Sequence, residues 1–363
     1  MTAAPSSVLV VGAGLAGSRC AETLRAEGFD GGLVVIGDEL LPPYERPALS
    51  KEVLAGTKAE HELLLRPPSW WAEQEIDLRL GERIVRVDPQ HRRATTASGN
   101  ELRWDVLVLA TGARPRRLPF PVPRGVHALR TVVDARALRR ALVPEARLVV
   151  VGGGFVGAEV ASTALDLGVG VTMLEALSAP FERTLGPTLG RLLAERYRSY
   201  GVDLRVETGV AGFGAGRDGT VRSARLTDGS DLVCDVALVG IGVEPADELL
   251  SGVSEEVPIH VCGDVGGGLG HWTSAATEAA AVARRILGRT RQPAPPPFFW
   301  SDQFGLRLQL VGRANAGDAV ELDGGEESFL ACYRDPEGRL VAALGANRPA
   351  DVAGLRRELA VAA

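Results

Sequence analysis

The chain has 363 residues, enough for two or three domains at about 150 residues each. Hydrophobic residues make up 45% and charged residues 24% of the composition, which excludes a disordered tail protein and an integral membrane protein. The net charge of −6 means that the chain has no overall excess of positive charge for binding nucleic acid or anionic lipid.

The N-terminal segment predicts a strand, a tight turn, a helix and a second strand. An apolar run, Val8 to Val11, leads into the sequence GAGLAG at residues 12–17, and a helical pattern continues to Ala26. A second apolar run covers residues 33–36, so the chain opens with a βαβ unit. Further on, residues 104–109 predict a buried strand that ends in the turn Ala110-Thr111-Gly112.

The same order of elements returns in the middle of the chain. Residues 147–151 predict a strand, GGGFVG at 152–157 predicts a tight turn, and residues 158–167 and 169–174 predict a helix and a strand. Residues 235–239 then form an apolar run that closes on glycines, among them Gly242. The chain is therefore expected to contain two copies of one nucleotide-binding unit.

The remaining segments complete the predicted architecture. Asp264 lies at the tip of a predicted strand that starts at Ile259, residues 273–287 predict a helix, and strand patterns alternate over 298–344 after a proline-rich break. The fold class is therefore α/β, with two Rossmann-like dinucleotide-binding domains and a small α+β C-terminal domain. The predicted boundaries are 1–116 with 242–297 for the first domain, 117–241 for the second and 298–363 for the third.

The two glycine-rich turns carry the main functional signal. In such a turn the first glycine takes an unusual backbone angle, the second lets a pyrophosphate approach the main chain, and the third permits close packing of helix on strand. The helix N-terminus that follows favours phosphate. The glycines concerned are Gly12, Gly14 and Gly17 in the first turn, and Gly152, Gly154 and Gly157 in the second. Two dinucleotides are therefore expected to bind.

An acidic residue follows each turn at the distance that suits ribose recognition. Glu39 lies 22 residues after Gly17, and Glu175 lies 18 residues after Gly157. A carboxylate at the tip of the second strand accepts hydrogen bonds from the adenosine ribose, and its charge repels a 2′-phosphate. The sequence thus favours NADH over NADPH at the second site. The alternative for each residue is a solvated glutamate at a strand end.

Cysteine usage and the N-terminus point to the cytoplasm. The four cysteines form no C-x-x-C pair, so neither a metal knuckle nor a redox-active dithiol is expected, and no metal site is predicted. The N-terminus lacks the basic and apolar regions of a signal peptide, and no run of 18 apolar residues occurs. We therefore predict a cytoplasmic protein that does not associate with membrane or nucleic acid.

Several strings together resemble the FAD-dependent NADH:ferredoxin reductases that serve Rieske dioxygenases and bacterial cytochromes P450, of the putidaredoxin reductase and rubredoxin reductase type. The most specific is PYERPALSK at residues 43–51, and the likeness covers nearly the whole chain. The other strings are ATG at 110–112, GGGFVGAE at 152–159, the turn at 240–245, GDV at 263–265, FWSDQ at 299–303 and NRP at 347–349. The resemblance implies a glutathione-reductase-like fold.

The resemblance also assigns expected roles to single residues. FAD would be held by the first turn with Glu39, Arg46 and Asp264, and NADH by the second turn with Glu175. Further cofactor contacts are expected from Ala110, Thr111, Gly112, Gly242, Trp272 and Trp300. In related enzymes a lysine matching Lys51 sits by flavin N5 and pairs with a glutamate matching Glu159; a surface lysine is the alternative.

Three aromatic residues and the arginines have open roles. Phe155 either gates hydride access to the flavin or packs in the core. Trp272 and Trp300 either shape electron exit or are ordinary core residues. Arginines such as Arg307, Arg313 and Arg334 either form a docking face for an acidic ferredoxin or are solvated surface.

The implied activity is transfer of a hydride from NADH to FAD, followed by single-electron transfer to a [2Fe–2S] ferredoxin, by a monomer or weak homodimer. Disulfide reductases and thiol-dependent oxidases need cysteine near Ser50, and this chain has none between Cys20 and Cys234. An NADH oxidase, quinone reductase or diaphorase, and an NADH-sensing interaction protein, remain alternatives. Two departures from the family pattern are the short segment 251–258 and Gly270-His271 before Trp272.

Overall fold

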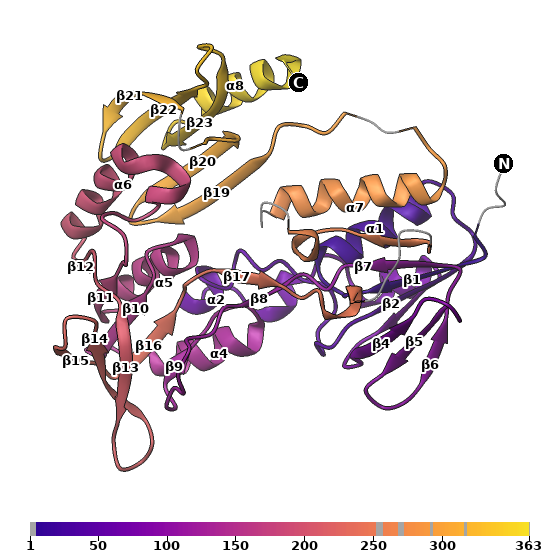
Figure 1. Cartoon of the computed structure of the whole chain (residues 1–363), viewed down its shortest axis with the longest axis horizontal. Helices are drawn as coiled ribbons and strands as arrows, with labels where there is room; N and C mark the ends of the chain where they lie inside the picture. Colours follow the sequence, from indigo (N-terminus) through magenta and orange to yellow (C-terminus); the bar gives the residue numbers. More distant parts are fainter. Residues whose placement is uncertain (1–4, 252–256, 268–271, 291–292, 316–317, 363) are drawn as a thin grey trace. The chain divides into compact units, whose positions relative to one another are not determined.

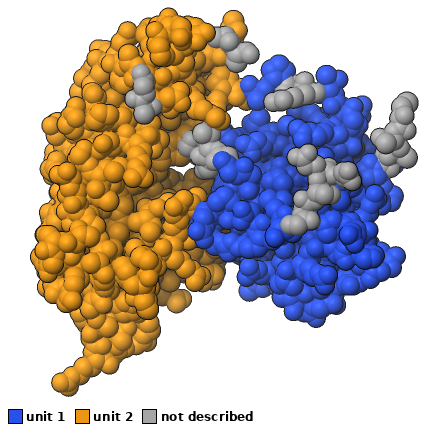
Figure 2. Space-filling model, in the orientation of Figure 1, with its two compact units in different colours: residues 1–45, 61–114, 244–294 blue, residues 46–60, 115–243, 295–363 orange. Residues whose placement is uncertain are grey.

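The computed structural model describes residues 5–251, 257–267, 272–290, 293–315 and 318–362, and Figure 1 shows its helices and strands. The shortened segment 251–258 and the residues before Trp272 lie largely outside the described ranges. The chain divides into two compact units, coloured in Figure 2. Unit 1 contains residues 1–45, 61–114 and 244–294, and unit 2 contains residues 46–60, 115–243 and 295–363.

Unit 1 is built on a five-stranded parallel sheet. Its strand order is β18 (Ile259–Val261), β7 (Val106–Leu109), β1 (Ser7–Val11), β2 (Gly32–Ile36) and β3 (Ile76–Arg79). The central strands β1 and β7 are apolar apart from Ser7, because both faces of the sheet are covered. The helices α1 (Leu15–Ala26) and α7 (Trp272–Ile286) pack together on one face, with Cys20, Leu24, Ala279 and Ala283 in their shared core (Figure 1).

The other face of this sheet is covered by an antiparallel layer. The strands β4 (Ile84–Asp88), β5 (Arg93–Thr96) and β6 (Glu101–Arg103) contribute Ile84 and Ala94 to a core that also holds Leu9 and Leu107. A short helix, α3 (Pro68–Glu73), and three single-turn helices (Glu60–Leu63, Glu248–Leu250 and Asp264–Gly266) complete the elements around it. The carboxyl ends of β1, β2, β7 and β18 therefore lie along one edge of a rigid sheet.

Unit 2 repeats this arrangement. The strand order of its parallel sheet is β12 (Asp203–Arg205), β11 (Gly170–Leu174), β10 (Arg147–Val151), β16 (Val236–Val239) and β9 (Val126–His127). Its helices are α2 (Glu52–Ala55), α4 (Val132–Ala141), α5 (Phe155–Asp166) and α6 (Glu182–Ser199), and an antiparallel layer comprises β13 (Val210–Ala215), β14 (Val221–Leu226) and β15 (Asp231–Val233). Thr131 and Asp134 form a capping box at the start of α4.

The C-terminal part of unit 2 is a five-stranded antiparallel sheet followed by a helix. The strand order is β19 (Phe298–Gln303), β20 (Leu306–Gly312), β23 (Leu340–Ala346), β22 (Ser328–Arg334) and β21 (Ala319–Gly325), and α8 (Pro349–Ala362) packs on β20 and β23. Leu308, Phe329 and Tyr333 belong to the same buried core as Val160 and Leu193. This sheet is therefore packed directly on α5 and α6.

The structure confirms the α/β fold class with two dinucleotide-binding sheets and a C-terminal α+β part. The helix predicted from residue 158 starts three residues earlier, at Phe155, because the second glycine turn opens directly into it. The two antiparallel layers and α2, α3, α4, α6 and α8 were not predicted, nor was the two-stranded pairing of β8 (Ala113–Pro115) with β17 (Val243–Pro245). The three domain boundaries stay a prediction. In the part of the chain that the structure describes, none of the helices combines the length and the apolar composition of a membrane span.

Candidate functional site

The first glycine turn has the backbone geometry that each of its glycines was expected to supply. Gly12 has φ +115°, and a Cβ there would lie 2.1 Å from the carbonyl oxygen of Ala110. A Cβ on Gly17 would lie 1.9 Å from the carbonyl oxygen of Gly12, whereas nothing lies within 4 Å of a Cβ on Gly14. The outer glycines thus permit tight packing, and the space beside Gly14 at the start of α1 is left for a phosphate.

The second turn repeats these contacts at the start of α5. Gly152 has φ +102°, and its Cβ would lie 2.5 Å from the carbonyl oxygen of Gly240, which occupies the place of Ala110 in the first turn. A Cβ on Gly157 would lie 2.2 Å from the carbonyl oxygen of Gly152. A Cβ on Gly154 would meet nothing closer than 4.0 Å. Both turns therefore fit the pyrophosphate of a dinucleotide.

The acidic residues lie at the tips of the second strands and face the turns differently. The Oε2 atom of Glu175 accepts a hydrogen bond of 3.0 Å from the amide of Gly153, and its Oε1 atom accepts one of 2.9 Å from Leu177. This carboxylate is therefore held against the glycine turn. Glu39 instead accepts a hydrogen bond of 2.6 Å from the hydroxyl of Tyr44. Carboxylate oxygens at these two positions are acceptors of the kind that ribose hydroxyls need.

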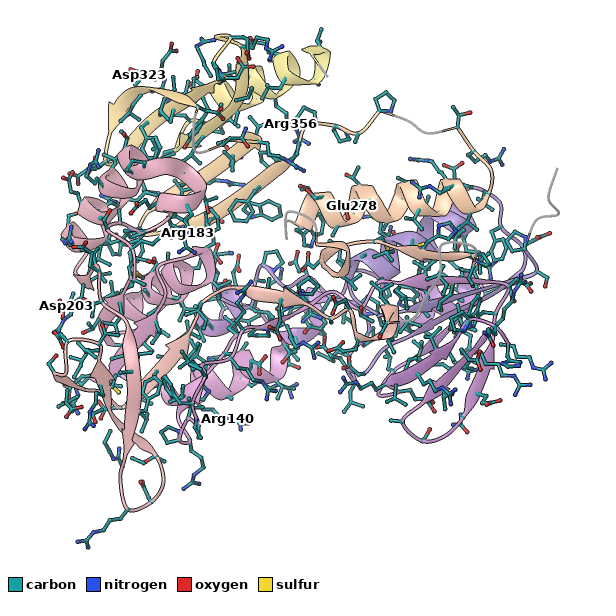
Figure 3. The ribbon with its side chains drawn as sticks, in the orientation of Figure 1. Arg140, Arg183, Asp203, Glu278, Asp323 and Arg356 are labelled. Atoms are coloured by element: carbon teal, nitrogen blue, oxygen red, sulfur yellow. The ribbon has the colours of Figure 1, made fainter. Side chains whose placement is uncertain are left out.

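The turns that follow β7, β16 and β18 are held by hydrogen bonds. The hydroxyl of Thr111 donates to the carbonyl of Ala246 at 2.7 Å, and the carbonyl of Gly242, which has φ +96°, accepts from the amide of Arg116 at 3.0 Å. Gly263, just before Asp264, has φ +77°, and its amide donates to Glu278 on α7, a residue labelled in Figure 3. Ala110, Gly112 and Asp264 therefore belong to ordered turns at the carboxyl ends of β7 and β18.

Half-buried Lys51 and buried Glu159 form an ion pair inside unit 2. The Nζ atom of Lys51 lies 3.0 Å from Oε2 of Glu159, and the two side chains are only 15% and 8% exposed. Lys51 directly precedes α2, and Glu159 lies in the first half of α5. The structure thus brings together two residues that the resemblance had paired, and it shows that Lys51 is not a surface lysine.

Two serines complete the surroundings of Glu159, and sequence reasoning missed both. Ser50 donates to Oε2 of Glu159 at 2.5 Å, and Ser301 on β19 donates to Oε1 at 2.7 Å. Each serine stands inside a string that carried the family resemblance, PYERPALSK and FWSDQ. Those strings were the available signal, but nothing in them indicates that they converge on one carboxylate.

The remaining predicted residues have varied surroundings. Phe155 packs between Phe181 and Phe299, with ring centroids 4.4 and 4.3 Å apart, so it is at least partly a core residue. Trp300 stacks on Phe298, with ring centroids 6.3 Å apart. The guanidinium of Arg356, a residue of α8 that Figure 3 labels, lies 4.6 Å from the ring centroid of Phe298. Arg46 donates to the carbonyl of Arg130 within unit 2 at 2.6 Å. Trp272 is the first residue of α7.

Residues 6–261 match the model of the pyridine nucleotide-disulphide oxidoreductase family, and residues 298–363 match the reductase C-terminal model. The chain belongs to this family. It is 35% identical to a ferredoxin–NAD(P)(+) reductase from Sphingomonas sp, in an alignment that covers 94% of this chain and 90% of the relative. It is 33% identical to putidaredoxin reductase from Pseudomonas putida, in an alignment that covers 96% of this chain and 90% of the relative. A crystal structure of the covalent putidaredoxin reductase–putidaredoxin complex superposes with TM-score 0.93, at 32% identity, over 99% of this chain and 94% of that one. The predicted resemblance is confirmed.

Three of the four cysteines in this member of the pyridine nucleotide-disulphide oxidoreductase family are buried, and the fourth, Cys332, is half-buried. All four cysteines are free. Burial raises the pKa of Cys234 to about 11 and that of Cys262 to about 12, and it holds the pKa of Cys20 well above the usual range. The thiolate is the reactive form of cysteine, so burial disfavours the reactive form of Cys20, Cys234 and Cys262 near neutral pH.

Proposed function

We propose that this chain is a flavoprotein reductase that takes a hydride from NADH onto FAD and passes electrons singly to a [2Fe–2S] ferredoxin, which feeds an oxygenase or a cytochrome P450. The observation that carries the proposal is the presence of two glycine turns with matching geometry, each open at its second glycine. The names of the relatives, which include ferredoxin reductases of dioxygenase systems, support the same activity. When bound, FAD supplies a hydride acceptor that releases electrons one at a time.

The residues present fit these two cofactors. In unit 1, the open position at Gly14 would admit the FAD pyrophosphate, Glu39 would hold the ribose, and Asp264 would meet the ribityl hydroxyls. In unit 2, Gly154 and Glu175 would hold NADH in the same manner. Both oxygens of Glu175 already accept backbone hydrogen bonds, so the carboxylate is fixed in place. In this position it would repel the 2′-phosphate of NADPH. This arrangement supports a preference for NADH over NADPH.

Lys51 is proposed to stabilise the negative charge that the flavin gains during hydride transfer. An ammonium fixed near the reacting atoms stabilises the negative charge that arrives with the hydride. Glu159 holds this ammonium, and it would otherwise be a buried, unpaired carboxylate of high energy. No side chain needs to donate or accept a proton in this step, so Lys51 and Glu159 act by position and charge.

The ferredoxin is proposed to be acidic and to approach arginines of the C-terminal sheet. Arg307 and Arg313 are exposed, whereas Arg334 is half-buried and paired with Glu321 at 3.1 Å. Opposite charges accelerate the encounter of two proteins. The predicted docking face is therefore better supported at Arg307 and Arg313 than at Arg334. The chain is proposed to act as a monomer or weak homodimer in the cytoplasm.

The experiment that tests this function is NADH titration of the purified protein, followed by addition of electron acceptors. Fast reduction of a bacterial [2Fe–2S] ferredoxin, with little hydrogen peroxide formed, is expected. Peroxide production at the same rate without ferredoxin would identify an NADH oxidase instead. Slow turnover with every acceptor, together with a long-lived complex of reduced flavin and NAD⁺, would identify an NADH sensor.

A further inference from the structure

Three buried polar side chains form a series of hydrogen bonds that ends at Oε1 of Glu159, whereas Lys51 pairs with Oε2. Ser301 donates to Oε1 of Glu159, and Nε2 of Gln303 donates to the hydroxyl of Ser301 at 2.9 Å. The hydroxyl of Tyr197, on α6, donates to Oε1 of Gln303. Ser301 and Tyr197 are 0% exposed and Gln303 is 2% exposed, so solvent does not compete for these bonds.

Each hydrogen bond in this series donates in the same direction, from Tyr197 toward the carboxylate of Glu159. A serine hydroxyl has one proton, and the bond from Gln303 occupies an oxygen lone pair and leaves that proton for Glu159. The amide of Gln303 is itself fixed, because its oxygen accepts the proton of Tyr197. Burial and the charge of Glu159 hold the pKa of Tyr197 well above its usual range, so Tyr197 remains a donor near neutral pH.

The placement of these residues follows from the C-terminal sheet. Ser301 and Gln303 alternate along β19 and therefore share one face of this edge strand, which packs on α5. A separate bond, from the amide of Phe304 to the hydroxyl of Ser162, joins the same strand region to α5 at 2.8 Å without touching Glu159. The strand is thus anchored independently of the polar chain.

We propose that Ser301, Gln303 and Tyr197 are positioning residues that fix the orientation of Glu159 and thereby hold the ammonium of Lys51 for hydride transfer. The inference rests on the proposed function for its last step. Ser50 and Lys51 both engage Oε2 of Glu159, so Ser301 provides the only side-chain hydrogen bond to Oε1 in the described part of the chain. Without that bond the carboxylate can rotate, and the position of the ammonium becomes variable.

The two lysines of the chain make the test direct. Lys51 and Lys58 are the only lysines in the sequence, so lysine-selective ¹⁵N and ¹³C labelling of the flavin-loaded protein yields two side-chain signals. In Ser301→Ala we expect the exchange of the Lys51 ammonium protons with water to rise about tenfold, the equivalent of about 1.4 kcal/mol for one charge-assisted hydrogen bond. The Lys58 signal serves as an internal reference and is expected to stay unchanged.

Stopped-flow reduction by NADH provides the second measurement. Ser301→Ala is expected to lower the limiting rate of flavin reduction about tenfold, whereas the NADH concentration for half-maximal rate stays the same because Glu175 is untouched. Ser162→Ala is the matched control, since it removes a buried hydroxyl between the same two elements. It is expected to lower the melting temperature but to leave the Lys51 signal and the reduction rate as they are.

Gln303→Met keeps the side-chain length and removes the amide. This variant tests the positioning role if Ser301→Ala does not fold. It is expected to shift the Lys51 signal in the same direction as Ser301→Ala, because the serine hydroxyl loses its orientation. Unchanged Lys51 exchange in a folded Ser301→Ala or Gln303→Met variant, or an equal change in Ser162→Ala, would overturn the inference. Failure of the proposed function would instead appear as absent ferredoxin reduction by the unmodified protein, whatever the Lys51 signal does.

Discussion

The ammonium of Lys51 is placed by a dense set of short contacts. It meets a carboxylate that also accepts hydrogen bonds from Ser50 and Ser301, and Thr163 donates to the carbonyl of Ser50 at 2.9 Å. Removing one partner of a buried pair leaves the other charge uncompensated. A substitution at this site should therefore keep the volume of the side chain, so that the loss of its charge is not confused with a change in packing.

Replacing Lys51 with methionine keeps most of the side-chain volume and removes the charge. We expect the rate of flavin reduction by NADH to fall by about 10- to 1000-fold, as for the loss of one group that stabilises developing charge. Stopped-flow absorbance of the flavin band measures this rate. Lys58→Met, on the same segment, is the control and should reduce at the unmodified rate. An unaltered rate in Lys51→Met would remove the proposed role.

Replacing Glu175 with alanine removes the proposed ribose clamp. Glu175→Ala is expected to lower the efficiency with NADH and to raise the relative efficiency with NADPH, because the carboxylate no longer repels the 2′-phosphate. Comparing kcat/KM for the two nucleotides in both proteins measures the change. If the unmodified protein already used NADH and NADPH equally well, the clamp would be refuted without any mutation.

At the scale of the elements, each strand–turn–helix unit combines packing with an open position. The first and third glycines of each turn lie against backbone carbonyls, and the second lies beside empty space. Stability and cofactor binding therefore depend on different glycines within the same six residues. This separation allows the two properties to be changed one at a time.

Gly17→Ala and Gly14→Ala form a matched pair that tests the separation. Gly17→Ala forces a methyl group against the carbonyl of Gly12 and is expected to cost about 2 kcal/mol or more of unfolding free energy. Gly14→Ala should leave the unfolding free energy of the flavin-free protein nearly unchanged but release FAD more readily, because the methyl group occupies the phosphate space. Urea unfolding and flavin fluorescence measure the two effects. Equal loss of stability in both variants would contradict this assignment.

At the scale of the whole molecule, charge decides how a partner approaches. The net charge of −6 disfavours an acidic partner on average, so docking of an acidic ferredoxin has to depend on local arginines. Within the C-terminal sheet, Arg334 is paired with Glu321, and Asp323, labelled in Figure 3, is paired with Arg348 at 3.2 Å. Arg307 and Arg313 are the exposed cations that remain from the predicted face.

The dependence of ferredoxin reduction on ionic strength tests this docking face. Association with an acidic ferredoxin is expected to slow as salt is raised, since exposed charges are screened within about 10 Å at 0.1 M. The double variant Arg307→Ala/Arg313→Ala should associate more slowly at low salt and show a weaker salt dependence. Flavin reduction by NADH in the same variant is the control and should not change. A flat salt dependence in the unmodified protein would indicate a different acceptor.

Local sequence patterns predict the two nucleotide-binding units, their glycine turns and the acidic residues at the strand tips, because these signals are short in range and occur twice. The sequence also supplied the strings that linked Lys51 and Glu159 through the family resemblance. The folded chain is needed to show that Ser50 and Ser301 bond to Glu159, with Gln303 and Tyr197 continuing the hydrogen bonds behind Ser301. These residues come from three distant segments, and packing of α2, α6 and β19 against α5 brings them together, a long-range effect that no local pattern contains.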